Sequence, residues 1–191
     1  MADNIYNSLI AEFQQAASFD DYKNAYMLYD LRHGSSKGRE WKASVFFVLA
    51  VGAVWYASVQ HFRLNELIMP ALVLVISVYM CVYYLFIVPS RSANRAERIY
   101  KSSWYISREK QYKFYRDNFT YKNEYEYQKR YYTEIYDCIE TKDTFILIGG
   151  LENSLTVIDK RQLDPKQREA LSSHFRSEMI RQYRNTEGKR K

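Results

Sequence analysis

The sequence predicts an α+β membrane protein, in which a two-helix transmembrane hairpin precedes a small antiparallel β-domain with a C-terminal helix. Three observations predict this fold class: two long uncharged apolar runs, basic residues at the outer ends of these runs, and short alternating runs with turn signals in the C-terminal half. The formal net charge of +6 over 191 residues also indicates an anionic neighbour, either a nucleic acid or a membrane surface.

The two uncharged runs are long enough to cross a bilayer. Residues 43–62 and 67–90 contain no Asp, Glu, Lys or Arg. Each run reaches the length of about 20 residues that a helix needs to cross a hydrocarbon core of roughly 30 Å. Neither run shows the polar stripe that is typical of a soluble core helix. Residues 63–66 join the runs, and so short a connection predicts an antiparallel hairpin.

Basic residues predict how this hairpin inserts. The connecting loop carries only Arg63, whereas the segments outside the two spans carry several lysines and arginines. The positive-inside rule therefore predicts that both termini and the β-domain are cytoplasmic. The basic residues nearest the membrane are also candidate contacts for anionic lipid headgroups; they are Lys42, Arg91, Arg95, Arg98 and Lys101.

Small residues predict how the two spans pack. Ala50, Ala53 and Ala57 fall on one face of the first helix, and Ser77 and Cys81 fall on one face of the second. Small side chains let helices approach closely in lipid, so hairpin packing is the simplest interpretation. A homo-oligomer or a partner-helix interface is the alternative. A transporter is poorly supported because neither span contains an ionisable Asp, Glu, Lys or Arg.

Residues 1–40 and 91–111 form the cytoplasmic segments on either side of the spans. Aromatic residues at spacings of three and four predict an amphipathic helix; they are Phe19, Tyr22, Tyr26 and Tyr29. The preceding residues 5–14 fit either a helix or a strand. Residues 91–111 predict a basic juxtamembrane helix or connector, and Pro89 and Arg91 mark the exit from the membrane.

Residues 112–184 predict the β-domain. About six short alternating runs are separated by turn signals, which indicates mostly antiparallel strands. Asp164 and Pro165 then predict the start of a helix, in which Leu171, Phe175 and Met179 form an apolar stripe. Residues 185–191 are expected to be a disordered basic tail.

The order of these elements resembles the YcxB-like family of bacterial membrane proteins. The resemblance lies in the N-terminal run SFDDYKNAYML and in the C-terminal run YYTEIYDCIETKDTFILIGGLENSLTVIDKRQLDPKQREALSSHF. It implies a pleckstrin-homology (PH)-like C-terminal domain and a location in the bacterial inner membrane. It also implies that residues 5–14 are a strand of the same sheet, with the hairpin inserted into the domain.

No constellation of residues predicts catalysis. His33, His61 and His174 lie in a pre-membrane loop, at the outer interface and on the C-terminal helix, so they are not expected to meet. Gly149 and Gly150 lack the Gly-Lys-Ser/Thr ending of a phosphate loop and predict a turn. We therefore expect a protein that is not an enzyme and that needs no metal or cofactor.

The tyrosine-rich run over residues 112–136 has several interpretations. Tyrosine is a good strand former, so packing within the sheet is the simplest one, a protein-binding surface comes second, and acidic residues disfavour nucleic acid. The sequence thus predicts a membrane protein that presents its β-domain to a protein partner or to anionic lipid. The alternatives are an immunity-type protein that protects the cell from a cognate toxin and an oligomeric pore.

Overall fold

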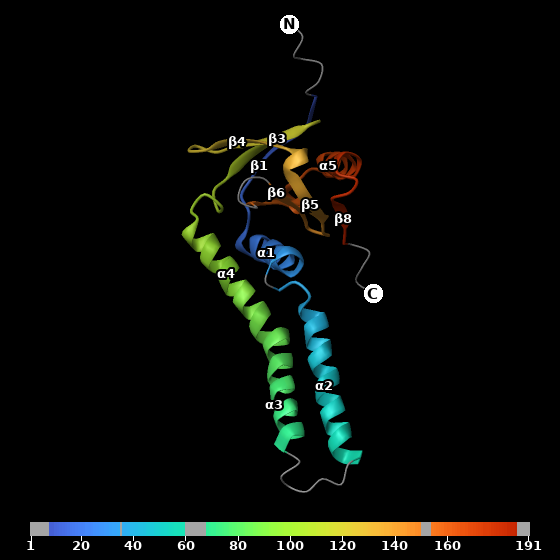
Figure 1. The fold of residues 1–191 in the computed structure, drawn as a ribbon. Helices are drawn as coiled ribbons and strands as arrows, with labels where there is room; N and C mark the ends of the chain where they lie inside the picture. The colour runs from blue at the N-terminus through green and yellow to red at the C-terminus, as the bar shows by residue number, and fades with distance from the viewer. Residues whose placement is uncertain (1–7, 35, 60–67, 150–153, 187–191) are drawn as a thin grey trace. The chain divides into compact units, whose positions relative to one another are not determined.

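The computed structural model describes residues 8–34, 36–59, 68–149 and 154–186. The chain forms two compact units, which are described separately (Figure 1). The β-unit contains residues 1–25 and 97–191, and the hairpin unit contains residues 26–96. The boundaries fall within two helices, α1 (Phe19–His33) and α4 (Val88–Ser102). The hairpin unit is therefore an insertion in the sequence of the β-unit.

The first sheet of the β-unit is antiparallel and has the order β1-β2-β3-β4. Its strands are β1 (Leu9–Gln15), β2 (Lys110–Tyr115), β3 (Asn118–Lys122) and β4 (Tyr127–Tyr131). Strand β1 pairs with β2, which follows the hairpin in the sequence. The segment that fitted both a helix and a strand is thus a strand from Leu9 onward, and residues 5–7 lie outside the described chain.

The second sheet has the order β7-β6-β5-β8. Strands β5 (Ile135–Glu140), β6 (Thr144–Gly149) and β7 (Ser154–Asp159) are antiparallel, and β8 (Tyr183–Asn185) lies parallel to β5. Short 3-10 turns, η3 (Tyr132–Glu134) and η5 (Lys160–Gln162), precede β5 and follow β7.

The expected disordered tail was placed too early in the sequence. Asn185 belongs to β8, and the Thr186 N–H donates to the Glu140 carbonyl at 2.9 Å. Pairing with β5 therefore orders these two residues, although their polar side chains gave no strand signal. Residues 187–191 lie outside the described chain.

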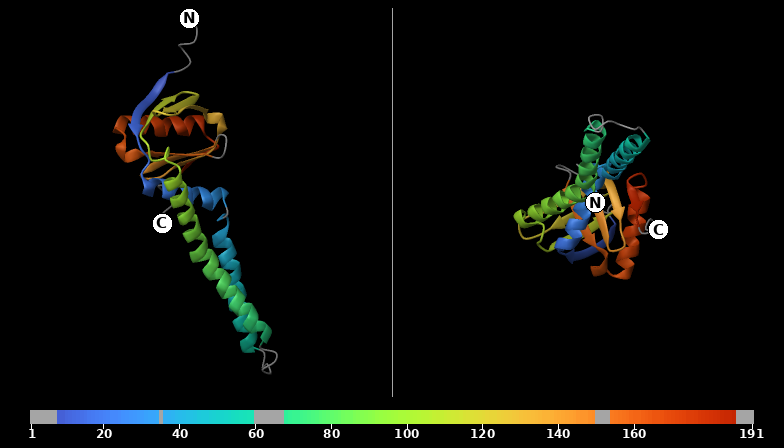
Figure 2. Two further views of the ribbon diagram at one scale, coloured as in Figure 1. Left: turned by 90° about the vertical axis from the view of Figure 1, so that its left-hand side faces the viewer. Right: turned by 90° about the horizontal axis from the view of Figure 1, so that it is seen from below.

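Helix α5 (Pro165–Glu178) packs against both sheets (Figure 2). The backbone N–H of Asp164 donates to Gln167 Oε1 at 3.3 Å, and Pro165 occupies the first turn, as the sequence predicted. Leu171, Phe175 and Met179 are fully buried. The Phe175 ring lies 5.7 Å from that of Phe114 on the first sheet and 5.4 Å from that of Phe145 on the second.

The hairpin unit is built from α2 (Arg39–Val59) and from a continuous helical rod of α3 (Ile68–Val82), the π-helix η2 (Tyr83–Ile87) and the start of α4. The rod continues through Pro89, so the juxtamembrane segment begins as a helix, which is one of the two interpretations that the sequence left open. A π-turn precedes the proline: the Val88 N–H bonds to the Tyr83 carbonyl five residues back, which shifts the hydrogen-bond register at this point.

Small residues line the contact between α2 and α3, as their spacing predicted. Ala50, Ala53 and Ser77 are buried, and the Cys81 thiol donates to the Ala43 carbonyl at 3.4 Å. Most large apolar side chains of these helices face outward instead. The helices Arg39–Val59 and Ile68–Ser102 are long and apolar enough to cross a membrane, and only 17% and 6% of their most apolar stretches are buried.

A buried ion pair joins the second sheet to α5 and β8. Lys160 Nζ lies 2.8 Å from Glu140 Oε1, and Ser172 and Tyr183 donate to Glu140 Oε2. Burial alone would raise the pKa of Glu140, but the hydrogen bonds from Lys160, Tyr183 and Ser172 outweigh it and hold the pKa below its ordinary value. The charged form of Glu140 therefore stabilises the folded β-unit.

We expect Phe175→Ala to destabilise the β-unit by about 3–5 kcal/mol, because it removes the ring that contacts both sheets and leaves a cavity. Ile180→Ala is the matched control, since Ile180 is exposed just beyond the same helix. Denaturant unfolding followed by circular dichroism in detergent micelles measures both. Equal decreases in the free energy of unfolding in the two variants would contradict the role given to Phe175.

The Glu140 network predicts a specific acid sensitivity. Because the pKa of Glu140 is lowered on folding, its contribution is fully present above the unfolded-state pKa of about 4.5 and is lost as the pH falls through the folded-state value. Glu140→Gln should therefore flatten the acid limb of the stability curve.

Removing Lys160, the partner of Glu140 in the ion pair, should lower the stability of the β-unit more than Glu140→Gln does. Lys160→Met leaves a buried carboxylate unpaired and should cost about 3–5 kcal/mol. Lys101→Met, which removes the exposed partner of Glu97, is the control and should have no measurable effect. A Lys160→Met variant as stable as the parent protein would show that the pair contributes nothing.

Candidate functional site

Four of the five predicted headgroup residues lie on α4 and one lies on α2. Arg91, Arg95 and Arg98 are exposed and share the helical spacing that the sequence predicted. Lys101 forms an ion pair with Glu97 at 2.6 Å, which neutralises its charge locally. Arg95 lies near Tyr26, whose pKa is raised by burial and partly lowered again by the charge of this arginine. The remaining pair, Lys42 and Arg91, has a more defined environment.

The π-helix presents two adjacent tyrosines to these cations. Lys42 Nζ lies 5.7 Å from the centre of the Tyr84 ring, and Arg91 Cζ lies 5.6 Å from the centre of the Tyr83 ring. Arg91 also donates to the Tyr83 hydroxyl at 3.3 Å. The two tyrosine rings meet edge to face at 5.4 Å. We call these four residues the cation–tyrosine cluster.

The local backbone explains why both rings take part. A π-turn adds one residue to the helical turn, so neighbouring side chains shift around the helix axis relative to an ordinary α-helix. Tyr84 stacks on Phe46 of α2 at 6.1 Å, while Tyr83 contacts Arg91 one turn beyond the π-helix. The sequence gave no sign that the two tyrosines would join cations from two helices.

The cation–tyrosine cluster can bind an anion. Lys42 and Arg91 are exposed, and no carboxylate forms an ion pair with either of them within the described residues. Ammonium and guanidinium groups next to phenol rings offer hydrogen-bond donors to a phosphate while their stems cover apolar surface.

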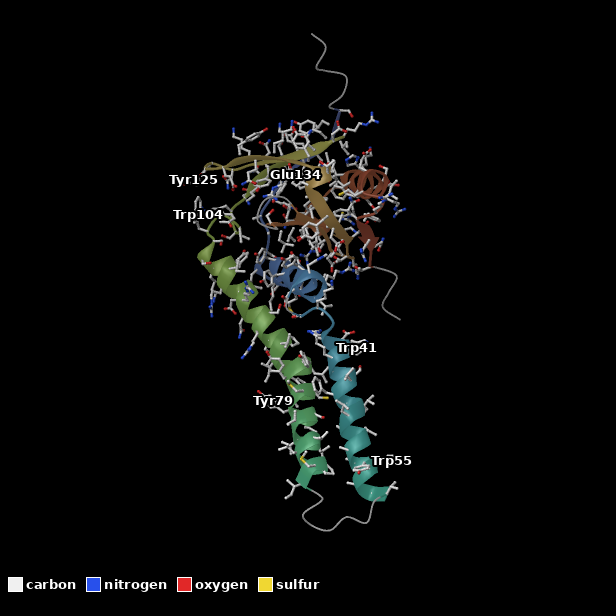
Figure 3. All side chains as sticks on the ribbon, viewed as in Figure 1. Trp41, Trp55, Tyr79, Trp104, Tyr125 and Glu134 are labelled. Carbon is white, nitrogen blue, oxygen red and sulfur yellow. The ribbon has the colours of Figure 1, made fainter. Side chains whose placement is uncertain are left out.

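The tyrosine-rich run divides into a buried and an exposed part. Tyr112, Tyr121 and Tyr132 are buried in the β-unit, which agrees with packing in the sheet. Other tyrosines of the run are exposed, namely Tyr125, Tyr127, Tyr131 and Tyr136. Strand β4, which carries two of these, is an edge of its sheet. Trp104 packs edge to face on Tyr125 with ring centres 4.9 Å apart (Figure 3).

A shallow concavity of about 500 Å³ lies beside this exposed aromatic pair. Amide side chains from three strands or their ends line it, namely Gln14, Gln111 and Asn123, together with Arg108, Glu109, Lys122, Glu124 and Tyr125. Its charges are balanced between basic and acidic groups. The concavity and the exposed tyrosines offer a polar, aromatic surface of the kind that protein interfaces use.

The structure places some of the residues that the sequence raised as candidates for catalysis. No group of three or more His, Cys, Asp or Glu side chains that could hold a metal occurs among them. His174 packs on Tyr132 at 5.1 Å between ring centres, and burial lowers its pKa. Gly149 ends β6 opposite Ser154 of β7, whereas His61 and Gly150 lie outside the described chain.

Comparison with known proteins gives one match. A family model described as YcxB-like protein matches residues 114–175, from β2 to α5, which confirms the resemblance over these residues. No curated protein and no solved structure matches the chain.

Proposed function

We propose that this chain, whose residues 114–175 match the YcxB-like protein family, is a non-enzymatic integral membrane protein of the bacterial inner membrane. Its hairpin unit anchors the chain, and its β-unit binds a protein partner or anionic lipid on the cytoplasmic side. The observation that carries this proposal is the outward-facing apolar surface of two long helices, with basic residues gathered at one end of the hairpin.

The exposed apolar surface favours a membrane environment. Large apolar side chains such as Phe47, Val51, Leu72 and Val75 are exposed along α2 and α3. A water-soluble protein rarely exposes so long an apolar surface, whereas lipid tails cover it at no cost. The basic residues before α2 and within α4 then favour cytoplasmic termini.

The architecture of the β-unit supports a binding role. Two sheets with a C-terminal helix packed against both agree with the PH-like fold that the family resemblance implies. Folds of this kind present strand edges to partners, and β4 has one free edge next to exposed tyrosines. Anionic lipid is the second ligand, through the cation–tyrosine cluster at the level where headgroups would lie.

Cysteine labelling tests the proposed topology. In intact cells, a membrane-impermeant maleimide should label Asn65→Cys in the predicted outer loop and should leave Ser177→Cys on α5 unlabelled. Permeabilised cells should show labelling of Ser177→Cys, because its position is exposed on the β-unit. The parent protein, whose Cys138 is buried and whose Cys81 is half-buried, sets the background. Labelling of Ser177→Cys in intact cells would contradict a cytoplasmic β-unit.

The role of the cation–tyrosine cluster can be tested by lipid retention. We expect Lys42→Gln/Arg91→Gln to reduce the phosphatidylglycerol that co-purifies with the full-length protein in mild detergent. Each cation near a membrane surface contributes on the order of 1 kcal/mol, which corresponds to about fivefold per residue. Mass spectrometry of the lipids, relative to phosphatidylethanolamine, measures the change.

The control removes the same charge elsewhere. Arg98→Gln/Lys101→Gln also lowers the net charge by two, but neither residue belongs to the cation–tyrosine cluster, and Lys101 is already paired with Glu97. Its lipid retention should fall much less than that of Lys42→Gln/Arg91→Gln. An equal loss in both double variants would show that only the total charge matters and that the cluster is not a site.

A further inference from the structure

Three features at one end of the first sheet are unexplained by the packing of the β-unit. Gln15, the last residue of β1, pairs with Lys110, the first residue of β2. Directly opposed residues of paired strands point to the same face of a sheet. That face is the core-facing one, because Ala11 and Tyr112 on the same faces of these strands are buried.

The Lys110 ammonium lies among aromatic rings. Its Nζ is 4.8 Å from the centre of the Tyr121 ring and 5.5 Å from that of Tyr105. No carboxylate of the described chain lies within ion-pair distance of it. Burial lowers the pKa of Lys110, the more distant charge of Glu126 opposes this shift, and the charge of Arg130 adds to it.

The side-chain amide of Gln15 is buried and unpaired. The residue is only 3% exposed, and neither Nε2 nor Oε1 has a hydrogen-bond partner among the described residues. A buried amide without partners is unfavourable and is rare in folded proteins unless a ligand or water satisfies it. Gln15 lies directly opposite Lys110, whose ammonium has no ion-pair partner among the described residues either.

A second cation, the buried Arg130, also contacts Tyr121. Arg130 Cζ is 5.7 Å from the centre of the Tyr121 ring, and its Nη2 donates to the Tyr121 hydroxyl at 3.3 Å. Its remaining partners are neutral: the Gly149 carbonyl at 3.0 Å, Gln128 Oε1 at 2.9 Å and the Ser154 hydroxyl. Arg130 thus holds the Tyr121 ring that Lys110 contacts and adds a second positive charge beside it.

We propose that Lys110 and Gln15 form a binding site for a phosphomonoester, with Tyr121 as its floor and Arg130 as a positioning residue. Lys110 supplies the positive charge and Gln15 the amide donor. A phosphomonoester fits because its negative charge complements the Lys110 ammonium, and because Lys110 and Tyr105 are partly exposed and leave the phosphate a path from solvent. This inference rests on the proposed binding role of the β-unit and gives that role a ligand class.

The test uses the full-length protein and defined probes. Calorimetric titration in neutral detergent micelles with glycerol 3-phosphate reports a soluble source of the phosphate. Nanodiscs of phosphatidylcholine with and without phosphatidic acid report a lipid source, through the shift in thermal unfolding that the acidic lipid causes. Sodium chloride at equal ionic strength controls for general salt effects.

Matched variants locate the site. Lys110→Met should weaken binding of the phosphate probe at least tenfold. Gln15→Leu should weaken the same binding severalfold while the protein stays folded, because this substitution replaces an unpaired amide with an apolar side chain of similar size. Lys113→Met is the control: it lies on the same strand but pairs with Glu12 at 3.0 Å on the other face, and it should bind as the parent protein does.

The outcomes separate this site from the rest of the protein. Saturable binding of either probe that Lys110→Met abolishes and Lys113→Met retains supports the site and identifies its source. No saturable binding of either probe, or equal loss in both lysine variants, overturns it. The Lys42→Gln/Arg91→Gln variant should keep its affinity for glycerol 3-phosphate, so a failure of the cation–tyrosine cluster cannot be mistaken for a failure of this site.

Discussion

The β-unit depends on the contact of one ring with both of its sheets. Phe175 on α5 is fully buried and touches Phe114 from the first sheet and Phe145 from the second. Neither sheet has more than four strands, so each needs an apolar surface to cover its inner face. Helix α5 supplies that surface to both at once, and the strands that carry the candidate sites are positioned as a result.

A second set of contacts incorporates the N-terminal segment into the β-unit. Strand β1 extends the first sheet, and Gln167 of α5 donates to the Glu12 carbonyl at 2.9 Å. Asp21 pairs with Arg161 at 2.6 Å. Tyr100 packs on Phe19 and donates to the Ala17 carbonyl, so the segments that lead to and from the hairpin are held side by side. The first sheet of the β-unit can therefore form completely only after the hairpin unit, which lies between β1 and β2 in the sequence, has been synthesised.

Function in this protein separates into two kinds of surface. The hairpin unit offers exposed cations next to tyrosines at a π-turn, which suits the headgroup level of a membrane. The β-unit offers a free strand edge, an aromatic pair, the half-buried Lys110 beside two tyrosine rings, and the buried Gln15 amide, which has no hydrogen-bond partner among the described residues. We propose binding roles for both because each gathers polar groups whose hydrogen-bonding capacity the described residues do not fully use.

Local patterns in the sequence determined the long apolar helices, most strand positions and the start of α5 at Pro165, since these depend on periodicity, charge and capping within a few residues. The tertiary structure alone decided the rest. Whether residues 9–15 form a strand, whether Asn185 is ordered and whether the helix passes Pro89 depends on hydrogen bonds to distant segments or on a register shift. The pairing of Lys42 with Tyr84 and of Gln15 with Lys110 joins residues about 40 and 95 positions apart, which no local pattern encodes because only the folded chain brings them together.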